Sequence, residues 1–194
     1  MDNIRKLVIL GAGGHGKAVA EAAELSGDWT EIVFMDDNHS VQTQSGAWRI
    51  VGTTRELGQL AGACAAAIVA VGNQHVREHL SQSLGALGIP LATIVHPKAY
   101  VSGHAVVGPG SAIMAGAIVG TGATLGCGVI VNANATVDHD ATLGDFAHLG
   151  VGVQLAGGVV IGARAWLQAG CCAGYRVNVA PGAIVKPGSS LSAD

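Results

Sequence analysis

The stretch 131-VNANATVDHDATLGDFAHLG-150 decides the fold, because apolar residues recur in it at every sixth position. Val131, Val137, Leu143 and Leu149 form one series, and a compact apolar residue follows each of them four positions later. A period of six fits neither an amphipathic helix nor an alternating strand. It is typical of a solenoid, in which stacked short strands bury each other's apolar faces.

On either side of this stretch the two series continue without a slip from Val95 to Leu191, over sixteen hexads. The repeat resembles that of the hexapeptide-repeat acyltransferases, although carbonic anhydrase-like and purely structural proteins share it. The resemblance implies a left-handed parallel β-helix over residues 94–194. In that family three hexads make one triangular coil, so residues 18 positions apart lie directly above one another.

Residues 1–93 instead alternate between strand-like and helix-like segments. Strands are predicted at 7–10, 31–35, 65–71 and 91–95, and helices at 17–26 and 75–87. This alternation is typical of a small Rossmann-like parallel sheet with crossover helices. The sequence therefore predicts two domains, an α/β domain over 1–93 and a β-helix over 94–194.

A glycine-rich segment, Gly11-Ala12-Gly13-Gly14-His15-Gly16, matches GxGxxG between the first predicted strand and helix. Backbone amides at a helix N-terminus are suited to a pyrophosphate. A dinucleotide coenzyme or a nucleotide sugar would both use these amides, with Asp36 or Asp37 on the ribose; a loop that only packs strand on helix is the third alternative. One half-domain is too small for a complete dinucleotide fold, which favours the nucleotide sugar.

Composition and charge exclude several classes of function. The net charge of −3 disfavours nucleic acid and anionic membranes as partners. The longest apolar run, about 61–71, is far shorter than the ~20 residues of a bilayer span, and no secretion signal is evident at the N-terminus. The four cysteines lack CxxC spacing. We therefore expect a cytoplasmic protein with reduced thiols and without membrane insertion.

The segment His75-Val76-Arg77-Glu78-His79 matches the HxxEH pattern of inverted zinc proteases. Two helical histidines four positions apart can share a metal ion. No third ligand follows in a suitable context, because everything beyond Val95 belongs to the repeat. A solvated helix face explains the pair, and no metal is expected.

Five segments extend the resemblance to the whole chain. They are GAGGHG (11–16), VFMDDN (33–38), AVGNQHVR (70–77), VNANATVDHDATLGDFAH (131–148) and GVGVQLAGG (150–158). The chain resembles the bacterial sugar acetyltransferases, which include UDP-4-amino-sugar N-acetyltransferases of bacillosamine synthesis and sialic-acid O-acetyltransferase-like proteins. The resemblance implies a homotrimer with acetyl-CoA between adjacent β-helices. It also implies that the nucleotide sugar is surrounded by Gly13, Gly14, His15, Asp36, Asp37, Gly72 and Asn73.

Acyl transfer from a thioester needs a general base and donors for the oxyanion. The candidate base is His139, flanked by Asp138 and Asp140. A neighbouring carboxylate fixes the imidazole tautomer, and Asp140 is the preferred orienting acid, although the matching family positions carry glutamates. Gly157 lies 18 positions after His139, one coil above it, so its amide is the expected oxyanion donor; the resemblance assigns it the same role.

The resemblance supplies four further residues. It implies that His148 contacts acetyl-CoA, that Asn132 is an active-site asparagine, and that the backbone at Ala169 and Pro187 meets the cofactor. An alternative role for His148 is a hydrogen bond at the trimer interface. Asn132 has the alternative of a side-chain ladder with Asn134, which needs no substrate.

The leading hypothesis is N-acetylation of a UDP-linked 4-amino-4-deoxy sugar, with His139 as base and direct attack of the amine on acetyl-CoA. Within the enzyme class the alternative is O-acetylation of a sialic acid or another capsular or surface sugar. Outside it, the alternative is a non-catalytic sugar-binding or structural β-helix trimer. A zinc hydratase on the same solenoid would need three histidines converging between subunits.

Overall fold

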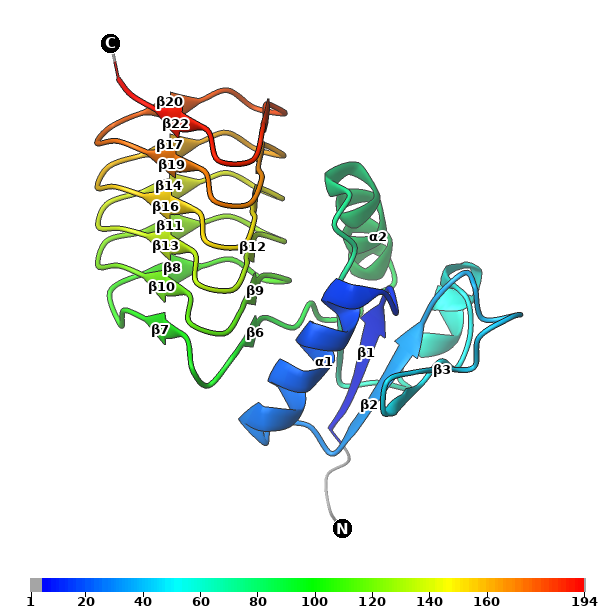
Figure 1. Cartoon of the computed structure of the whole chain (residues 1–194). Helices are drawn as coiled ribbons and strands as arrows, with labels where there is room; N and C mark the ends of the chain where they lie inside the picture. Colours follow the sequence, from blue (N-terminus) through cyan, green and yellow to red (C-terminus); the bar gives the residue numbers. More distant parts are fainter. Residues whose placement is uncertain (1–4, 194) are drawn as a thin grey trace. The chain divides into compact units, whose positions relative to one another are not determined.

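The structure is a computed structural model that describes residues 5–193. Its contacts divide the chain into two compact units, which meet between Ile94 and Val95 (Figure 1). The first unit combines a parallel sheet with helices, and the second is a parallel β-helix. The predicted fold class is therefore correct for each unit.

The sheet of the first unit has the strand order β2-β1-β5. Its strands are β1 (Lys6–Leu10), β2 (Glu31–Met35) and β5 (Ala66–Val69), and the helices are α1 (Gly14–Ser26) and α2 (Gln74–Ala86). The central strand β1 pairs in parallel with both neighbours, and its residues 7–10 have no exposed surface. Strand β1 therefore fixes where α1 and the glycine-rich loop begin.

The predicted fourth strand near 91–95 does not join this sheet. Leu91 forms a single bridge to Ala67, and Ile94–Val95 is instead β6, the first strand of the β-helix. Pro90 has no N–H to donate, so pairing cannot extend back along this segment.

Three short elements of the first unit were not predicted. They are β3 (Gln44–Ser45), β4 (Trp48–Arg49) and the 3₁₀ helix η1 (Thr54–Leu60). The β3–β4 hairpin is tied to the glycine-rich loop, because Ser45 Oγ donates to the carbonyl oxygen of Ala12 at 2.6 Å. A capping box between Thr53 and Glu56 begins η1.

The β-helix consists of two-residue strands stacked in three parallel sheets (Figure 1). The first sheet holds β6 (Ile94–Val95), β9 (Ala112–Ile113), β12 (Ile130–Val131), β15 (His148–Leu149), β18 (Trp166–Leu167) and β21 (Ile184–Val185). The second holds β7 (Tyr100–Val101), β10 (Ile118–Val119), β13 (Thr136–Val137), β16 (Gln154–Leu155), β19 (Cys172–Ala173) and β22 (Ser190–Leu191). The third holds β8 (Val106–Val107), β11 (Thr124–Leu125), β14 (Thr142–Leu143), β17 (Val160–Ile161) and β20 (Asn178–Val179).

Paired residues in these sheets are 18 positions apart, as in Ile118↔Thr136 and Thr136↔Gln154. Apart from Val95, Ser111 and Ser189, the members of both predicted series form one continuous apolar cluster, which is fully buried along its middle and partly buried at its ends. Full burial of each branched side chain contributes about 1.5–3 kcal/mol, so the repeat itself supplies the core.

The turns between sheets carry the unusual backbone torsions. Glycine occupies most positions of positive φ, but Asn134 and Asp140 adopt φ of 56° and 57°. A side chain at such a position is held in place by its surroundings, and such residues cluster at functional sites. Within residues 5–193 no helix is long and apolar enough to cross a membrane.

Candidate active site

His139 lies in the turn that leads from β13 to β14, where the second sheet meets the third. Its side chain is half exposed. The ring nitrogen Nδ1 lies 2.8 Å from Oδ2 of Asp140, while the backbone amide of His139 donates to Oδ1 of Asp138 at 2.7 Å. Asp140 therefore orients the ring, and Asp138 holds the backbone beneath it.

Within the described residues, the other ring nitrogen, Nε2, has no hydrogen-bond partner. When Nδ1–H donates to the Asp140 carboxylate, the neutral ring carries its lone pair on Nε2, which is the state of a general base. The hydrogen bond to Asp140, followed by the negative charge of Asp138, raises the pKa of His139 above the ordinary 6.5.

An NMR titration of the His139 ring is therefore expected to show a midpoint above 6.5. Asp140→Asn replaces the carboxylate that raises the pKa most with a neutral amide, so the midpoint should move to lower pH, while Asp138→Asn should move it less. If Asp140→Asn left the midpoint where it was, the 2.8 Å contact would not govern the protonation of this ring.

Gly157 lies one coil above His139, and the imidazole occupies the space in front of it. A Cβ atom added to Gly157 would collide with Cε1 and Nε2 of the ring. One coil below Asp140, a Cβ added to Gly122 would lie 2.6 Å from its Oδ1. Because Gly157 and Gly122 have no side chains, the His139 ring and the Asp140 carboxylate have the space in which they meet.

The backbone amide of Gly157 is available as a donor. Among residues 5–193 nothing accepts a hydrogen bond from it, whereas the next amide, Gly158 N–H, donates to the carbonyl oxygen of His139 at 2.9 Å. An unused N–H beside a base is the arrangement that stabilises an oxyanion. His139, Asp140 and Gly157 thus lie together at one corner of the β-helix.

The remaining predicted residues of the β-helix lie elsewhere in the coil. Asn132, Ala169 and Pro187 occupy the preceding corner, between the first and second sheets, where Gly188 N–H donates to Ala169 O at 2.9 Å. His148 lies on the first sheet, where its ring stacks on Trp166 with centroids 5.5 Å apart. Within one chain, one sheet of the β-helix therefore lies between these residues and His139.

In the first unit the glycines of the loop have distinct roles. Gly11 has φ +101°, and a Cβ there would lie 2.9 Å from Cγ2 of Val71. Gly16 packs directly against the carbonyl oxygen of Gly11, whereas Gly13 and Gly14 face open space. No side chain caps α1, and within residues 5–193 the amides of Gly13 and Gly14 donate no hydrogen bond, as an anion site requires.

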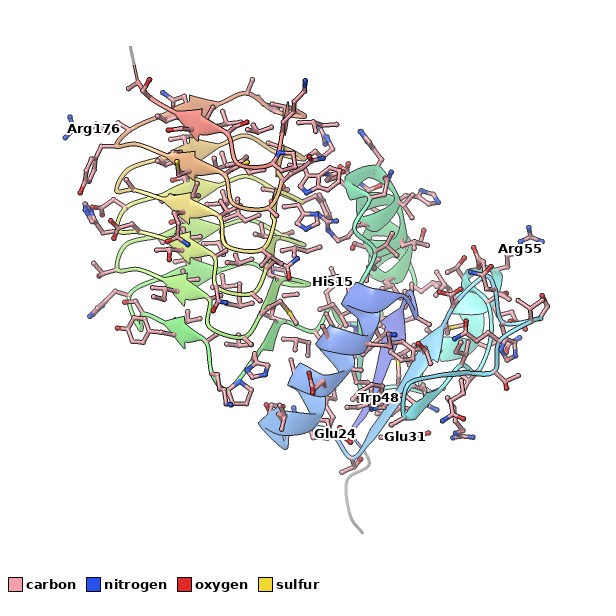
Figure 2. The ribbon with its side chains drawn as sticks, viewed as in Figure 1. His15, Glu24, Glu31, Trp48, Arg55 and Arg176 are labelled. Atoms are coloured by element: carbon pink, nitrogen blue, oxygen red, sulfur yellow. The ribbon has the colours of Figure 1, made fainter. Side chains whose placement is uncertain are left out.

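His15 stands at the first turn of α1 (Figure 2). Burial, with a smaller effect of the Arg77 charge, lowers the pKa of His15 to about 4, so its ring is neutral at physiological pH. Among the described residues none forms a hydrogen bond with its Nε2. A neutral imidazole with a buried, unused nitrogen at a helix N-terminus is suited to donate to a ligand.

Arg77 is a residue that sequence reasoning missed. It is 1% exposed and donates to the carbonyl oxygens of Val71 at 2.8 Å and Gly72 at 3.0 Å. Asn73 begins α2 by accepting a hydrogen bond from Val76 N–H at 3.0 Å. Arg77 therefore holds the Gly72–Asn73 turn from below, and the only sequence signal for it was its place in the AVGNQHVR segment.

The two adjacent acids after β2 have different surroundings. Asp36 accepts hydrogen bonds from the amides of Ala12 at 2.8 Å and Asn38 at 2.9 Å, so it organises the glycine-rich loop. Asp37 accepts from the side chain of Thr54 at 2.7 Å and its amide at 2.9 Å, which lowers the pKa of Asp37. Asp37 is exposed and available to a ligand.

Asp37 also faces two clefts. The larger has a volume of about 570 Å³ and is lined by Asp37, Thr54, Arg55, Leu57, His75, Val76, His79, Leu80 and Ser83. The smaller, of about 280 Å³, is lined by Asp37, Ser40, Thr53 and Arg55. Within residues 5–193 no group of three or more His, Cys, Asp or Glu side chains is arranged to hold a metal ion.

The chain resembles known acetyltransferases in sequence and in fold. The profile of the PglD N-terminal domain family matches residues 6–84. UDP-N-acetylbacillosamine N-acetyltransferase of Bacillus subtilis (strain 168) is 30% identical over 110 residues, which are 56% of this chain and only 50% of that relative.

Two solved structures match nearly the whole chain. The acetyltransferase domain of PglB from Neisseria gonorrhoeae FA1090, in complex with acetyl coenzyme A, is 40% identical with a TM-score of 0.92 and covers 97% of this chain and 93% of its own. PerB from Caulobacter crescentus, in complex with CoA and GDP-perosamine, is 31% identical with a TM-score of 0.90 and covers 98% and 92%.

Proposed function

The chain belongs to the family of sugar acetyltransferases that contains these relatives, and we propose that it transfers an acetyl group from acetyl-CoA to the amino group of a nucleotide-linked 4-amino-4-deoxy sugar. The observation that carries the proposal is the His139–Asp140 pair stacked on the unused amide of Gly157. This corner contains the base, the group that orients it and the oxyanion donor that acyl transfer needs.

The reaction has two steps, addition of the amine to the thioester carbonyl and collapse of the tetrahedral intermediate. The sugar amine attacks the thioester carbonyl, a C–N bond forms, and His139 Nε2 takes the proton that the amine loses. Gly157 N–H stabilises the oxyanion, and the carboxylate of Asp140 stabilises the imidazolium. When the C–S bond breaks, coenzyme A leaves as the thiolate and receives the proton from His139.

The first unit binds the nucleotide in this proposal. The open amides at Gly13 and Gly14 receive the diphosphate, with the neutral ring of His15 beside them. Asp37 is ionised and exposed just after β2, and its carboxylate accepts hydrogen bonds from the ribose hydroxyls. An acid at this place in a Rossmann-like sheet has the same role. Asp36 acts indirectly, through the loop that it holds, and Gly72 and Asn73 form the opposite rim.

Acetyl-CoA lies between adjacent β-helices of a homotrimer in this proposal. His148, Ala169 and Pro187 occupy a wall and a corner that His139 of the same chain does not share, so a coenzyme that contacts both groups fits between two copies. The four cysteines are unpaired, which suits a reaction in the reducing cytoplasm. Sedimentation equilibrium should give the mass of three chains; a monomer that retains activity would contradict shared sites.

A pair of matched sugars tests the reaction. The purified full chain, given acetyl-CoA and a UDP-linked 4-amino-4-deoxy sugar, should release free thiol, and the 4-hydroxy counterpart should release little. Thiol release with the hydroxy sugar alone would favour O-acetylation. No thiol release with either, together with no calorimetric binding of coenzyme A, would leave a sugar-binding or structural role instead.

A further inference from the structure

Arg176 lies at the same corner of the β-helix as His139, in the turn from β19 to β20, one coil above Gly157. Its side chain is exposed and extends outward from this turn (Figure 2). The backbone amide of Arg176 donates to the carbonyl oxygen of Gly157 at 3.1 Å. Arg176 is therefore joined by one backbone hydrogen bond to the residue that supplies the expected oxyanion donor.

The backbone at Arg176 has a torsion that favours glycine, although the position carries a long cationic side chain. Arg176 has φ 56°, and the residues one and three coils below it are Gly158 and Gly122, with φ 68° and 70°. A Cβ atom added to Gly158 would lie 3.4 Å from Cγ of Arg176. The aliphatic part of Arg176 therefore packs over Gly158, while its guanidinium stays in solvent.

Arg176 is the cation of this corner. It is the sole lysine or arginine in the described turns between the second and third sheets, which lie at 102–105, 120–123, 138–141, 156–159 and 174–177. Among residues 5–193 no carboxylate forms an ion pair with its guanidinium. A guanidinium in this state presents a planar fork of donors, which suits a phosphate group.

A cleft of about 580 Å³ runs along the β-helix beside the same corner. Its lining includes Asp138, next to the candidate base, and continues upward through Ala156 and Gly174 to Ser192. Each of these residues lies 18 positions after the one before it, so the cleft spans four successive coils. The cleft therefore leads from the catalytic corner up past the turn that carries Arg176.

The length of coenzyme A matches this distance. Neighbouring coils are about 4.8 Å apart, so the backbone of Arg176 lies about 10 Å above that of Asp140. An extended arginine side chain adds about 6 Å, and the pantetheine arm between the sulfur and the pyrophosphate of coenzyme A spans about 15 Å, at roughly 3.5 Å for three chain bonds. With the thioester at His139 and Gly157, an arm that follows the cleft brings the pyrophosphate within reach of the guanidinium.

Charge also favours a cation at this place. The chain has a net charge of −3 and coenzyme A is an anion, so the overall field of the protein opposes its binding. The other expected coenzyme contacts are the backbone at Ala169 and Pro187 and the ring of His148, none of which carries a permanent positive charge. The phosphates of the coenzyme therefore still need a cationic partner.

We propose that Arg176 binds the pyrophosphate of acetyl-CoA, whose pantetheine arm follows the 580 Å³ cleft up from the catalytic corner. The inference rests on the proposed function, because it presupposes a thioester at His139 and Gly157. It assigns Arg176 as a coenzyme-binding residue that has no part in the chemical step.

Titration of the full chain with coenzyme A, dephospho-coenzyme A and pantetheine tests the proposal. Calorimetry should show that Arg176→Gln weakens the binding of coenzyme A and of dephospho-coenzyme A about tenfold each, the effect of one lost charge-assisted hydrogen bond. Pantetheine, whose weaker binding is followed by ligand-detected NMR, should bind the variant and the wild type alike. Arg176→Lys keeps the charge and should recover most of the lost affinity.

Lys98→Gln is the matched control. Lys98 is exposed in the first coil, at the corner between the first and second sheets, and its replacement changes the net charge by the same amount. This variant should bind coenzyme A as the wild type does. Equal weakening in Lys98→Gln and Arg176→Gln would show an effect of total charge and would overturn the assignment of Arg176.

The remaining outcomes separate this inference from the proposed function. The assignment of Arg176 would be overturned by an unchanged affinity for coenzyme A in Arg176→Gln, by a loss that dephospho-coenzyme A does not share, or by an equal loss for pantetheine. Each of these results would leave the acetyl-transfer function standing. If the wild-type protein bound none of the three ligands, the proposed function would fail, and the assignment of Arg176 with it.

Discussion

His139→Ala should lower kcat for acetyl transfer at least about 100-fold, the usual contribution of a general base. Without the imidazole, no group at this corner takes the proton from the attacking amine, and Asp140 loses the ring that it orients. KM for acetyl-CoA should change little, because the expected coenzyme contacts lie on the wall and corner of His148, Ala169 and Pro187. The measurement is thiol release at saturating acetyl-CoA and sugar nucleotide.

His104→Ala is the matched control. His104 is exposed and lies two coils below Asp140 at the same corner, where its carbonyl oxygen accepts from Gly122 N–H at 3.3 Å. Its removal should leave kcat unchanged. If His139→Ala kept the wild-type kcat, His139 would not be the general base, even though the fold is as described.

Gly157→Ala should lower kcat about 100-fold while the β-helix stays folded. The new methyl group would occupy the space of the His139 ring, so the ring must leave Asp140 and its place beside the Gly157 amide. Displacement of a catalytic group by about 1 Å costs on the order of 100-fold in rate. Overpacking at one exposed corner costs about 1–3 kcal/mol of stability, so circular dichroism should still report a cooperative thermal transition.

Gly103→Ala provides the comparison for this substitution. Gly103 occupies the same column two coils below His139, and an added Cβ there meets nothing within 4 Å. It should keep both activity and thermal stability. If Gly157→Ala also kept full activity, the ring would not need the position in which it is found.

The β-helix was predictable because its order is local and periodic. Each hexad supplies its own inward residues, so a period of six read from the sequence also fixes the register of 18 between coils. That register was enough to predict that His139 and Gly157 meet. It did not decide between Asp138 and Asp140, because that choice depends on the φ of 57° that turns Asp140 toward the ring.

The first unit was less predictable, because its site is built by contacts distant in sequence. Asp36 and Asp37 look alike in the sequence, but one bonds to Ala12, 24 positions away, and the other to Thr54, 17 positions away. The 3₁₀ helix η1 forms one wall of the 570 Å³ cleft, but it is too short to show an apolar period from which it could be predicted. The burial of Arg77 could not be predicted from the sequence pattern, because a charged side chain on a helix is expected at the surface.

The central claim is that the proton of the attacking amine goes to a histidine paired with Asp140, and the pH dependence of kcat/KM tests it most directly. The base works only when neutral, so the rate should rise with pH through the raised pKa of His139. In Asp140→Asn the rising limb should move to lower pH, in step with the NMR midpoint of the same ring; the titration of the sugar amine is common to both proteins. A rising limb at the same pH in both proteins, while the NMR midpoint moves, would contradict the account.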